Sequence, residues 1–193
     1  MWWFYTVILG VSFGQVLSEL AIAVREWSRN PARRPFVPAM LWRLFLLALI
    51  VEVWLAATYY RGTVTEISIL ELVAFLVVPA AILIMSFLLP ESRHDPGPDG
   101  DLPAPAAFDR VRPVFFGVLI GMVAVNLLHG FLIGHQGWDI DLLFQCLLIA
   151  GAVAGLFVRN TAADIALAVL MIAVVAAYVG VGYSTVTVDG TTG

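Results

Sequence analysis

Six long apolar segments, separated by shorter polar stretches, make up most of this chain. An α-helix needs about 20 apolar residues to cross the hydrocarbon layer of a membrane. Lipid offers no partners to backbone N–H and C=O groups, so segments of this kind are expected to be helices. The pattern predicts an all-α polytopic membrane bundle, a single transmembrane domain over residues 1–193. The six predicted transmembrane helices are Trp3–Val24, Phe36–Tyr60, Ile67–Leu89, Val114–Gly134, Leu142–Val158 and Ala162–Tyr183.

Arginines between the predicted spans indicate which side of the membrane each loop faces. Cytoplasmic loops of membrane proteins carry an excess of basic residues. The loops after the first, third and fifth spans are therefore predicted to be cytoplasmic, and both termini are predicted to lie outside. The loop at 90–112 is rich in Pro, Gly and Asp, which favours a solvated linker; the alternative is a docking segment for a partner. The arginines of these loops are Arg25, Arg29, Arg33, Arg34, Arg93, Arg110, Arg112 and Arg159, whereas the opposite loops carry only Arg61.

The composition agrees with a membrane environment and excludes several classes of protein. Of the residues, 61% are hydrophobic and 12% are charged, whereas about a quarter are charged in soluble domains. The chain has no Lys, so it cannot form a retinal Schiff base. Cys146 is the only cysteine, which excludes an intrachain disulfide and a Cys-x-x-Cys pair. Abundant Arg, Ala, Val, Gly and Pro are typical of GC-rich bacterial genomes, and the expected location is the bacterial inner membrane.

The first and fourth spans align without gaps, from Phe4–Trp27 to Phe115–Trp138. Apolar positions, glycines and the final tryptophans coincide in this alignment. Three crossings reverse the chain direction, so the alignment predicts a 3+3 inverted repeat. Transporters built from inverted repeats place their binding sites between the repeats, near the middle of the bilayer.

Polar residues inside these two spans also coincide. Gln15 aligns with Asn126, and Ser18 aligns with His129. Each pair is spaced i, i+3, which puts both members on one face of a helix. A polar face inside hydrocarbon must point toward protein or water.

Two carboxylates are predicted to lie at a similar depth in the membrane to Asn126 and His129. Glu52 is about eight residues from the outer end of the second span, and Glu71 enters the third span from outside by about one turn. A carboxylate beside an imidazole can relay protons or bind a polar solute. The alternative is a satisfied hydrogen-bond network that only fixes helix packing. The predicted polar seam between the helices, continued toward the cytoplasm along the first span, consists of Glu52, Glu71, Asn126, His129, Gln15, Ser18 and Glu19.

Glu19 and Arg43 lie near the cytoplasmic ends of the first two spans. We expect them to form a structural ion pair, with the alternative that Arg43 extends to the lipid headgroups. Small residues offer a further kind of contact, because G-x-x-x-G spacing lets helix backbones approach closely. Such Gly-rich faces are candidate contacts in a homo-oligomer or a larger membrane complex. The pairs are Gly10 and Gly14, Gly117 and Gly121, and Gly151 and Gly155.

Catalytic motifs are missing from the sequence. No H-E-x-x-H, G-x-S-x-G or Walker A pattern occurs. His94, His129 and His135 are scattered, and no two of them share a span. We therefore expect no enzymatic activity, no metal site and no cofactor. The sequence has no basic-aromatic patch of the kind that binds nucleic acid, and the expected partner is the lipid bilayer.

Several short motifs resemble those of a group of uncharacterised bacterial six-helix integral membrane proteins. They are ILG in the first span, LWRLFLLALIVEVW in the second, AAILIMSFLLP at the end of the third, RVRPVFFGVL at the start of the fourth and FVRN at the end of the fifth. The resemblance implies a six-helix fold and the positions of the loops. It implies no activity, and it assigns no function to any residue of this chain.

Two functional hypotheses follow from these patterns. The first is a small membrane channel or transporter for protons or a small polar solute, which would pass along the polar seam. The second is a non-catalytic accessory or assembly subunit that packs into a larger membrane complex through its Gly-rich faces.

Overall fold

The computed structural model describes residues 2–30, 35–63, 68–90, 103–132 and 140–183. All regular secondary structure in these ranges is helical, and each helix is long and apolar enough to cross a membrane. This confirms the predicted all-α bundle of six helices. The helices are α1 (Trp2–Arg29), α2 (Val37–Thr63), α3 (Ile69–Leu88), α4 (Ala104–Leu132), α5 (Ile140–Phe157) and α6 (Thr161–Gly182).

Large apolar side chains cover the outer surface of the bundle. Trp3 is 85% exposed and Phe157 is 77% exposed. Each of the six helices carries exposed large apolar side chains. Soluble monomers rarely expose apolar patches of this extent. Hydrocarbon is the solvent that suits such a surface, so the structure indicates a multi-pass protein in a lipid bilayer.

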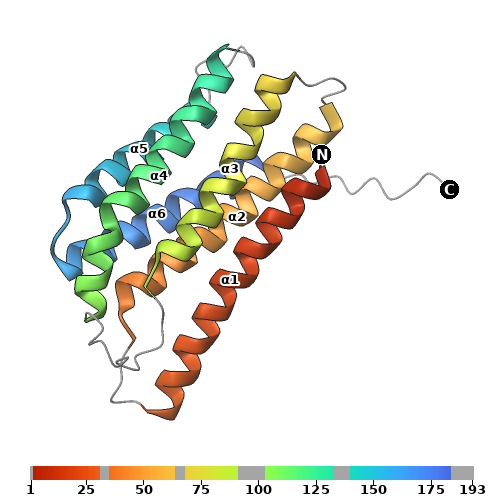
Figure 1. Cartoon of the computed structure of the whole chain (residues 1–193). Coiled ribbons are helices and arrows are strands. Elements are labelled where there is room, and N and C mark those ends of the chain that lie inside the picture. The colour runs from red at the N-terminus through yellow and green to blue at the C-terminus, as the bar shows by residue number, and fades with distance from the viewer. Residues whose placement is uncertain (1, 31–34, 64–67, 91–102, 133–139, 184–193) are drawn as a thin grey trace.

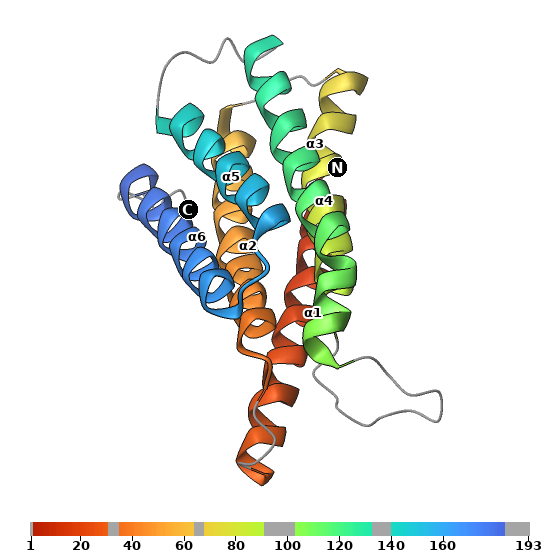
Figure 2. The same ribbon diagram turned by 90° about the vertical axis from the view of Figure 1, so that its left-hand side faces the viewer.

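The helices form a ring in the order α1, α2, α6, α5, α4, α3, and α2 also packs against α3 across it. Figure 1 shows the helices side by side with their axes roughly aligned, and successive helices run in opposite directions. The view in Figure 2 places α2 between the pair α5–α6 and the pair α3–α4. We call the end that holds the starts of α1, α3 and α5 the upper end, as in Figure 1, and the other the lower end.

The ring order bears on the predicted inverted repeat. A two-fold relation between the two halves would match the α3–α4 contact with an α6–α1 contact, and the α2–α6 contact with an α5–α3 contact. The first contact of each pair is extensive, and no comparable packing of the second appears within the described residues. The packing gives the repeat no support, so it stays a prediction from the sequence.

Helix α4 begins at Ala104 rather than at the predicted Val114. The end of the predicted loop at 90–112 is therefore helical, while residues 91–102 lie outside the described ranges. The sequence explains this extension. Pro105 falls in the first turn, where a missing N–H costs nothing, and the alanines that follow favour a helix. Phe108 and Arg112, one turn apart, are both buried against the bundle.

The lower half of the bundle is filled by aromatic side chains. Trp42 of α2 lies edge-on to Phe115 and Phe116 of α4, with ring centroids 5.8 and 4.9 Å apart. It also packs against Phe45, and all four rings have no exposed surface. Edge-to-face pairs of this kind are favourable beyond the area they bury. These rings leave the lower half closed.

Candidate functional site

A cavity of about 360 Å³ lies in the upper half of the bundle. Its volume falls in the range of about 300–1,000 Å³ that is usual for small-molecule sites. Every helix contributes to its wall, and the polar and aromatic members are Tyr5, Glu52, Phe75, Asn126, His129, Asp141, Phe144, Gln145, Tyr178 and Tyr183. The site therefore exists only when the whole bundle is assembled.

Glu52 of α2 is the most buried acidic residue of this cavity, at 8% exposure. It lies six residues before Thr58, where the apolar stretch of α2 ends, which is roughly 9 Å along the helix. Leu49, Val53 and Ala56 of the same face also line the cavity. Glu52 makes no hydrogen bond or ion pair with another described residue. An unpaired carboxylate in such a place must be stabilised by a proton, water or a ligand.

Helix α5 adds two polar residues, Asp141 and Gln145, spaced one turn apart on one face. Asp141 accepts a hydrogen bond from the hydroxyl of Tyr178. Gln145 is 7% exposed, and its Oε1 atom has no hydrogen-bond partner among the residues that the structure describes. Buried polar atoms are nearly always paired, so an orphan acceptor in a cavity wall marks a place for a donor. Neither residue was identified from the sequence, although the four-residue spacing of Asp141 and Gln145 was visible there.

Aromatic rings form two opposite parts of the wall. Phe144 of α5 stacks on Tyr178 of α6, with centroids 4.1 Å apart and planes 6° apart. Tyr5 of α1 stacks on Phe75 of α3, with centroids 4.2 Å apart. Tyr183 lies just beyond the apolar stretch of α6, and burial, with the nearby charge of Glu52, raises its pKa to about 12. Its phenol is therefore neutral and able to donate a hydrogen bond.

The structure brings together only part of the predicted seam. Glu52, Asn126 and His129 line the same cavity, with Asn126 exposed and His129 half-buried. Glu71 is not part of the cavity wall. Its carboxylate accepts a hydrogen bond from the Ser68 backbone N–H at 2.6 Å, and its own N–H donates to Ser68 Oγ at 3.2 Å. This capping box at the start of α3 is a structural role.

The polar residues of α1 lie away from the cavity. Gln15 is half-buried and Ser18 is exposed, and neither they nor Glu19 contribute to the cavity wall. The structure contains the ion pair between Glu19 and Arg43, whose Oε2 and Nη2 atoms are 3.4 Å apart. Arg43 also donates to the backbone carbonyl of Pro90, after α3. This cluster joins α1, α2 and the end of α3 near the lower end.

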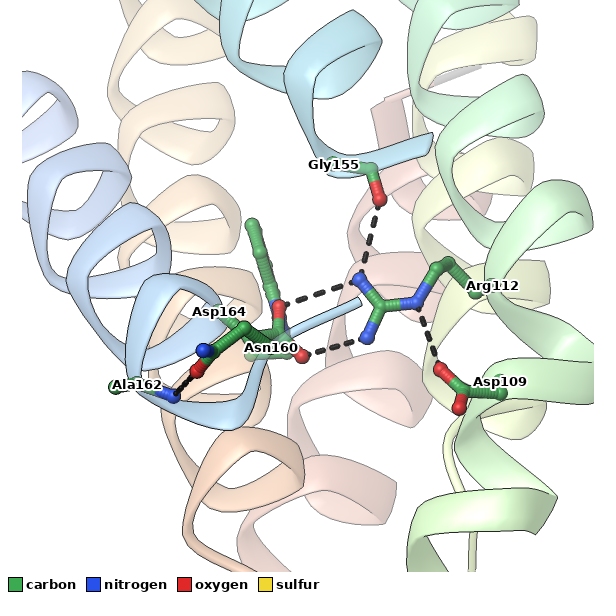
Figure 3. A network of polar contacts seen from close by, with 7 residues as sticks. Asp109, Arg112, Gly155, Asn160, Ala162 and Asp164 are labelled. Carbon is green, nitrogen blue, oxygen red and sulfur yellow. Dashed lines mark hydrogen bonds and ion pairs between the residues drawn. The ribbon is translucent and has the colours of Figure 1, made fainter. Parts of the chain in front are cut away.

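A second polar cluster, shown in Figure 3, also lies in the lower half. Arg112 of α4 and Asp164 of α6 form a buried ion pair, with Nη2 2.7 Å from Oδ2. Arg112 also donates to the carbonyl of Gly155 in α5 at 3.1 Å, and its Nε lies 3.1 Å from Asp109. The indole N–H of Trp42 in α2 donates to Asp164 at 3.1 Å. The cluster thus links α2, α4, α5 and α6.

These two clusters together connect the lower parts of all six helices. The sequence pattern placed Arg112 in the loop at 90–112, and Asp164 was not among the predicted site residues. No local spacing could have paired residues that are 52 positions apart. The bundle therefore has a cavity of ligand size in its upper half, and hydrogen bonds and ion pairs join the helices in its lower half.

The fold and this cavity define the class: a polytopic α-helical membrane protein with a cavity in one half of its bundle. No protein-family model, curated protein or solved structure matches the chain. The resemblance to bacterial six-helix membrane proteins rests on short motifs and stays a prediction.

Proposed function

We propose that the protein is a small non-catalytic transporter, which binds protons or a small polar solute in the upper cavity. The observation that carries this proposal is Glu52, a buried carboxylate that has no hydrogen-bond or ion-pair partner among the described residues, in a cavity walled by all six helices. Ionisable residues inside membrane bundles are costly, and they commonly mark a solute or ion pathway. Asn126 and His129 bring further polar groups to the same space.

A carrier fits the structure better than an open channel. A channel needs a continuous path, but the rings of Trp42, Phe115 and Phe116 fill the bundle below the cavity. The ion pair of Arg112 and Asp164 also joins the helices there. Transporters expose a central site to one side at a time through movement of helices against one another. In our proposal the structure corresponds to a state that is open at the upper end and closed at the lower end.

Flux through reconstituted protein tests this proposal. In proteoliposomes, Glu52→Gln should abolish the flux of protons or of small polar solutes, because it removes the charge while nearly keeping the shape. Glu71→Gln is the matched control, since Glu71 caps α3 outside the cavity. It should keep most of the flux. If flux through the wild-type protein never exceeds that of protein-free liposomes, the transport proposal fails.

One observation favours the alternative, an accessory subunit of a larger membrane complex. A Cβ atom added at Gly10, Gly14, Gly117 or Gly121 would meet nothing within 4 Å, so these glycines face outward from α1 and α4. Outward G-x-x-x-G faces can receive a helix of another chain. This proposal predicts a stoichiometric partner, or a second copy, in mild detergent. Gly14→Leu should release it, and a protein that migrates as a monomer before and after the change would contradict it.

A further inference from the structure

Among the side chains that the structure describes, the acidic residues Glu52 and Asp141 contribute to the cavity wall, and no Arg does. His129 is the one basic side chain of that described wall, and it is half-buried near the upper end. A concave space lined by one sign of charge attracts ligands of the opposite sign. The wall therefore favours a cation over an anion.

The hydrogen-bonding groups of the wall limit which kind of cation can bind. Within the part of the chain that the structure describes, Oε1 of Gln145 accepts no hydrogen bond and the carboxylate of Glu52 has no donor. The hydroxyl of Tyr178 already donates to Asp141. Glu52 and Oε1 of Gln145 thus offer open acceptors, and a ligand that brings N–H donors can satisfy both. An ammonium group has three donors and no acceptor, which matches this requirement.

The rest of the wall is apolar and aromatic. Two stacked pairs of rings, Tyr5 with Phe75 and Phe144 with Tyr178, contribute to it. Aromatic rings attract cations that approach their faces. The aliphatic members are Leu49, Val53, Ala56, Ala57, Ala74, Val78, Met122, Val123 and Leu148. Such a surface suits an organic ligand with an apolar body.

A bare metal ion fits this space less well. Calcium takes about six to eight oxygen ligands at short distances. The described residues contain no group of three His, Cys, Asp or Glu side chains placed to hold a metal ion. A cavity of about 360 Å³ is also far larger than one ion.

We propose that the cavity binds a small protonated amine with an apolar body. The ammonium group lies between Glu52 and Gln145, and the apolar part lies against the aromatic rings. This inference names the substrate class of the site described above, so it rests on the proposed function for its physiological meaning. Binding itself can be measured separately from transport.

Three related probes test the proposal on the full chain in detergent micelles by isothermal titration calorimetry. Phenethylammonium carries both the charge and the N–H donors. Its N-trimethylated form keeps the charge without the donors, and phenethyl alcohol keeps the shape without the charge. We expect saturable binding of phenethylammonium, at least tenfold weaker binding of the trimethylated form, and no saturable binding of the alcohol.

Variants connect this binding to the named side chains. Glu52→Gln should abolish binding of phenethylammonium, and Gln145→Leu should weaken it at least fivefold. Glu71→Gln should leave it unchanged. If Glu52→Gln fails to fold, Gln145→Leu still tests the proposal. We expect this variant to fold, because it replaces an unpaired buried amide with an apolar side chain of similar size.

The outcomes separate the two proposals. Equal binding of the amine and the alcohol, or of the amine and its trimethylated form, would overturn the assignment of a protonated amine. Binding of the amine without any flux in proteoliposomes would reject transport and leave the ligand class standing. Glu52-dependent flux of a neutral solute, with no binding of phenethylammonium, would reject the ligand class alone.

Discussion

Arg112 and Asp164 show how the effect of a buried ion pair depends on which partner is removed. Both side chains are buried, and Asp164 is also held by the indole of Trp42. Loss of one member leaves the other as an uncompensated buried charge, which typically costs about 3–5 kcal/mol. Loss of both together costs less, because no charge stays behind.

We therefore expect Arg112→Ala and Asp164→Ala each to lower the free energy of unfolding by about 3–5 kcal/mol. The double variant should lose clearly less than the sum of the two. Asp109→Ala is the control: its side chain is 45% exposed, and the change should cost at most about 1 kcal/mol. Thermal unfolding in detergent measures all four proteins. Additive losses in the double variant would show that the pair is not coupled.

At the residue scale, sequence reasoning found polar residues but not their directions. Glu52, Asn126 and His129 were placed at one depth, and they line one cavity. Gln15 and Ser18 had the same helical spacing as Asn126 and His129, but they lie outside the cavity wall. Depth follows from counting residues along a helix, whereas direction depends on how each helix is rotated in the ring. Without a known neighbour for each face, the sequence could not supply that rotation.

At the scale of helices, the six apolar segments predicted all six transmembrane helices, because the length and hydropathy of a segment decide whether it can span a membrane. Helix ends depend on local chemistry instead. The stretch before Val114 was taken as loop because of its prolines, but proline is compatible with a first helical turn. Which helices touch was also beyond the sequence, since every helix has apolar residues on several faces.

Close contact between α4 and α5 gives a prediction at this scale. A Cβ atom at Gly155 would lie 2.4 Å from the ring of Phe116, which is fully buried. Gly155→Ala should therefore destabilise the protein by about 1–3 kcal/mol through overpacking. Gly14→Ala on α1 is the matched control, because nothing lies within 4 Å of a Cβ there. The difference in melting temperature between the two variants measures the effect, and equal melting temperatures would contradict the packing at Gly155.

At the scale of the whole molecule, the two ends of the bundle differ in structure and in charge. The cavity lies toward the upper end, whereas the ion pairs and most arginines lie toward the lower end. The positive-inside rule then predicts that the lower end faces the cytoplasm. On that orientation the cavity opens to the outside, and solute would enter from there.

Selective labelling of cysteines tests this orientation. In a background with Cys146→Ala, single changes Ser68→Cys at the upper end and Ser28→Cys at the lower end place exposed thiols on opposite sides. Ser68→Cys weakens the cap of α3 by about 1 kcal/mol, which the bundle should tolerate. In intact expressing cells, a membrane-impermeant maleimide should label the cysteine at position 68 and reach position 28 only after permeabilisation. The reverse pattern would place the cavity on the cytoplasmic side, and the proposed carrier would then take its solute from inside.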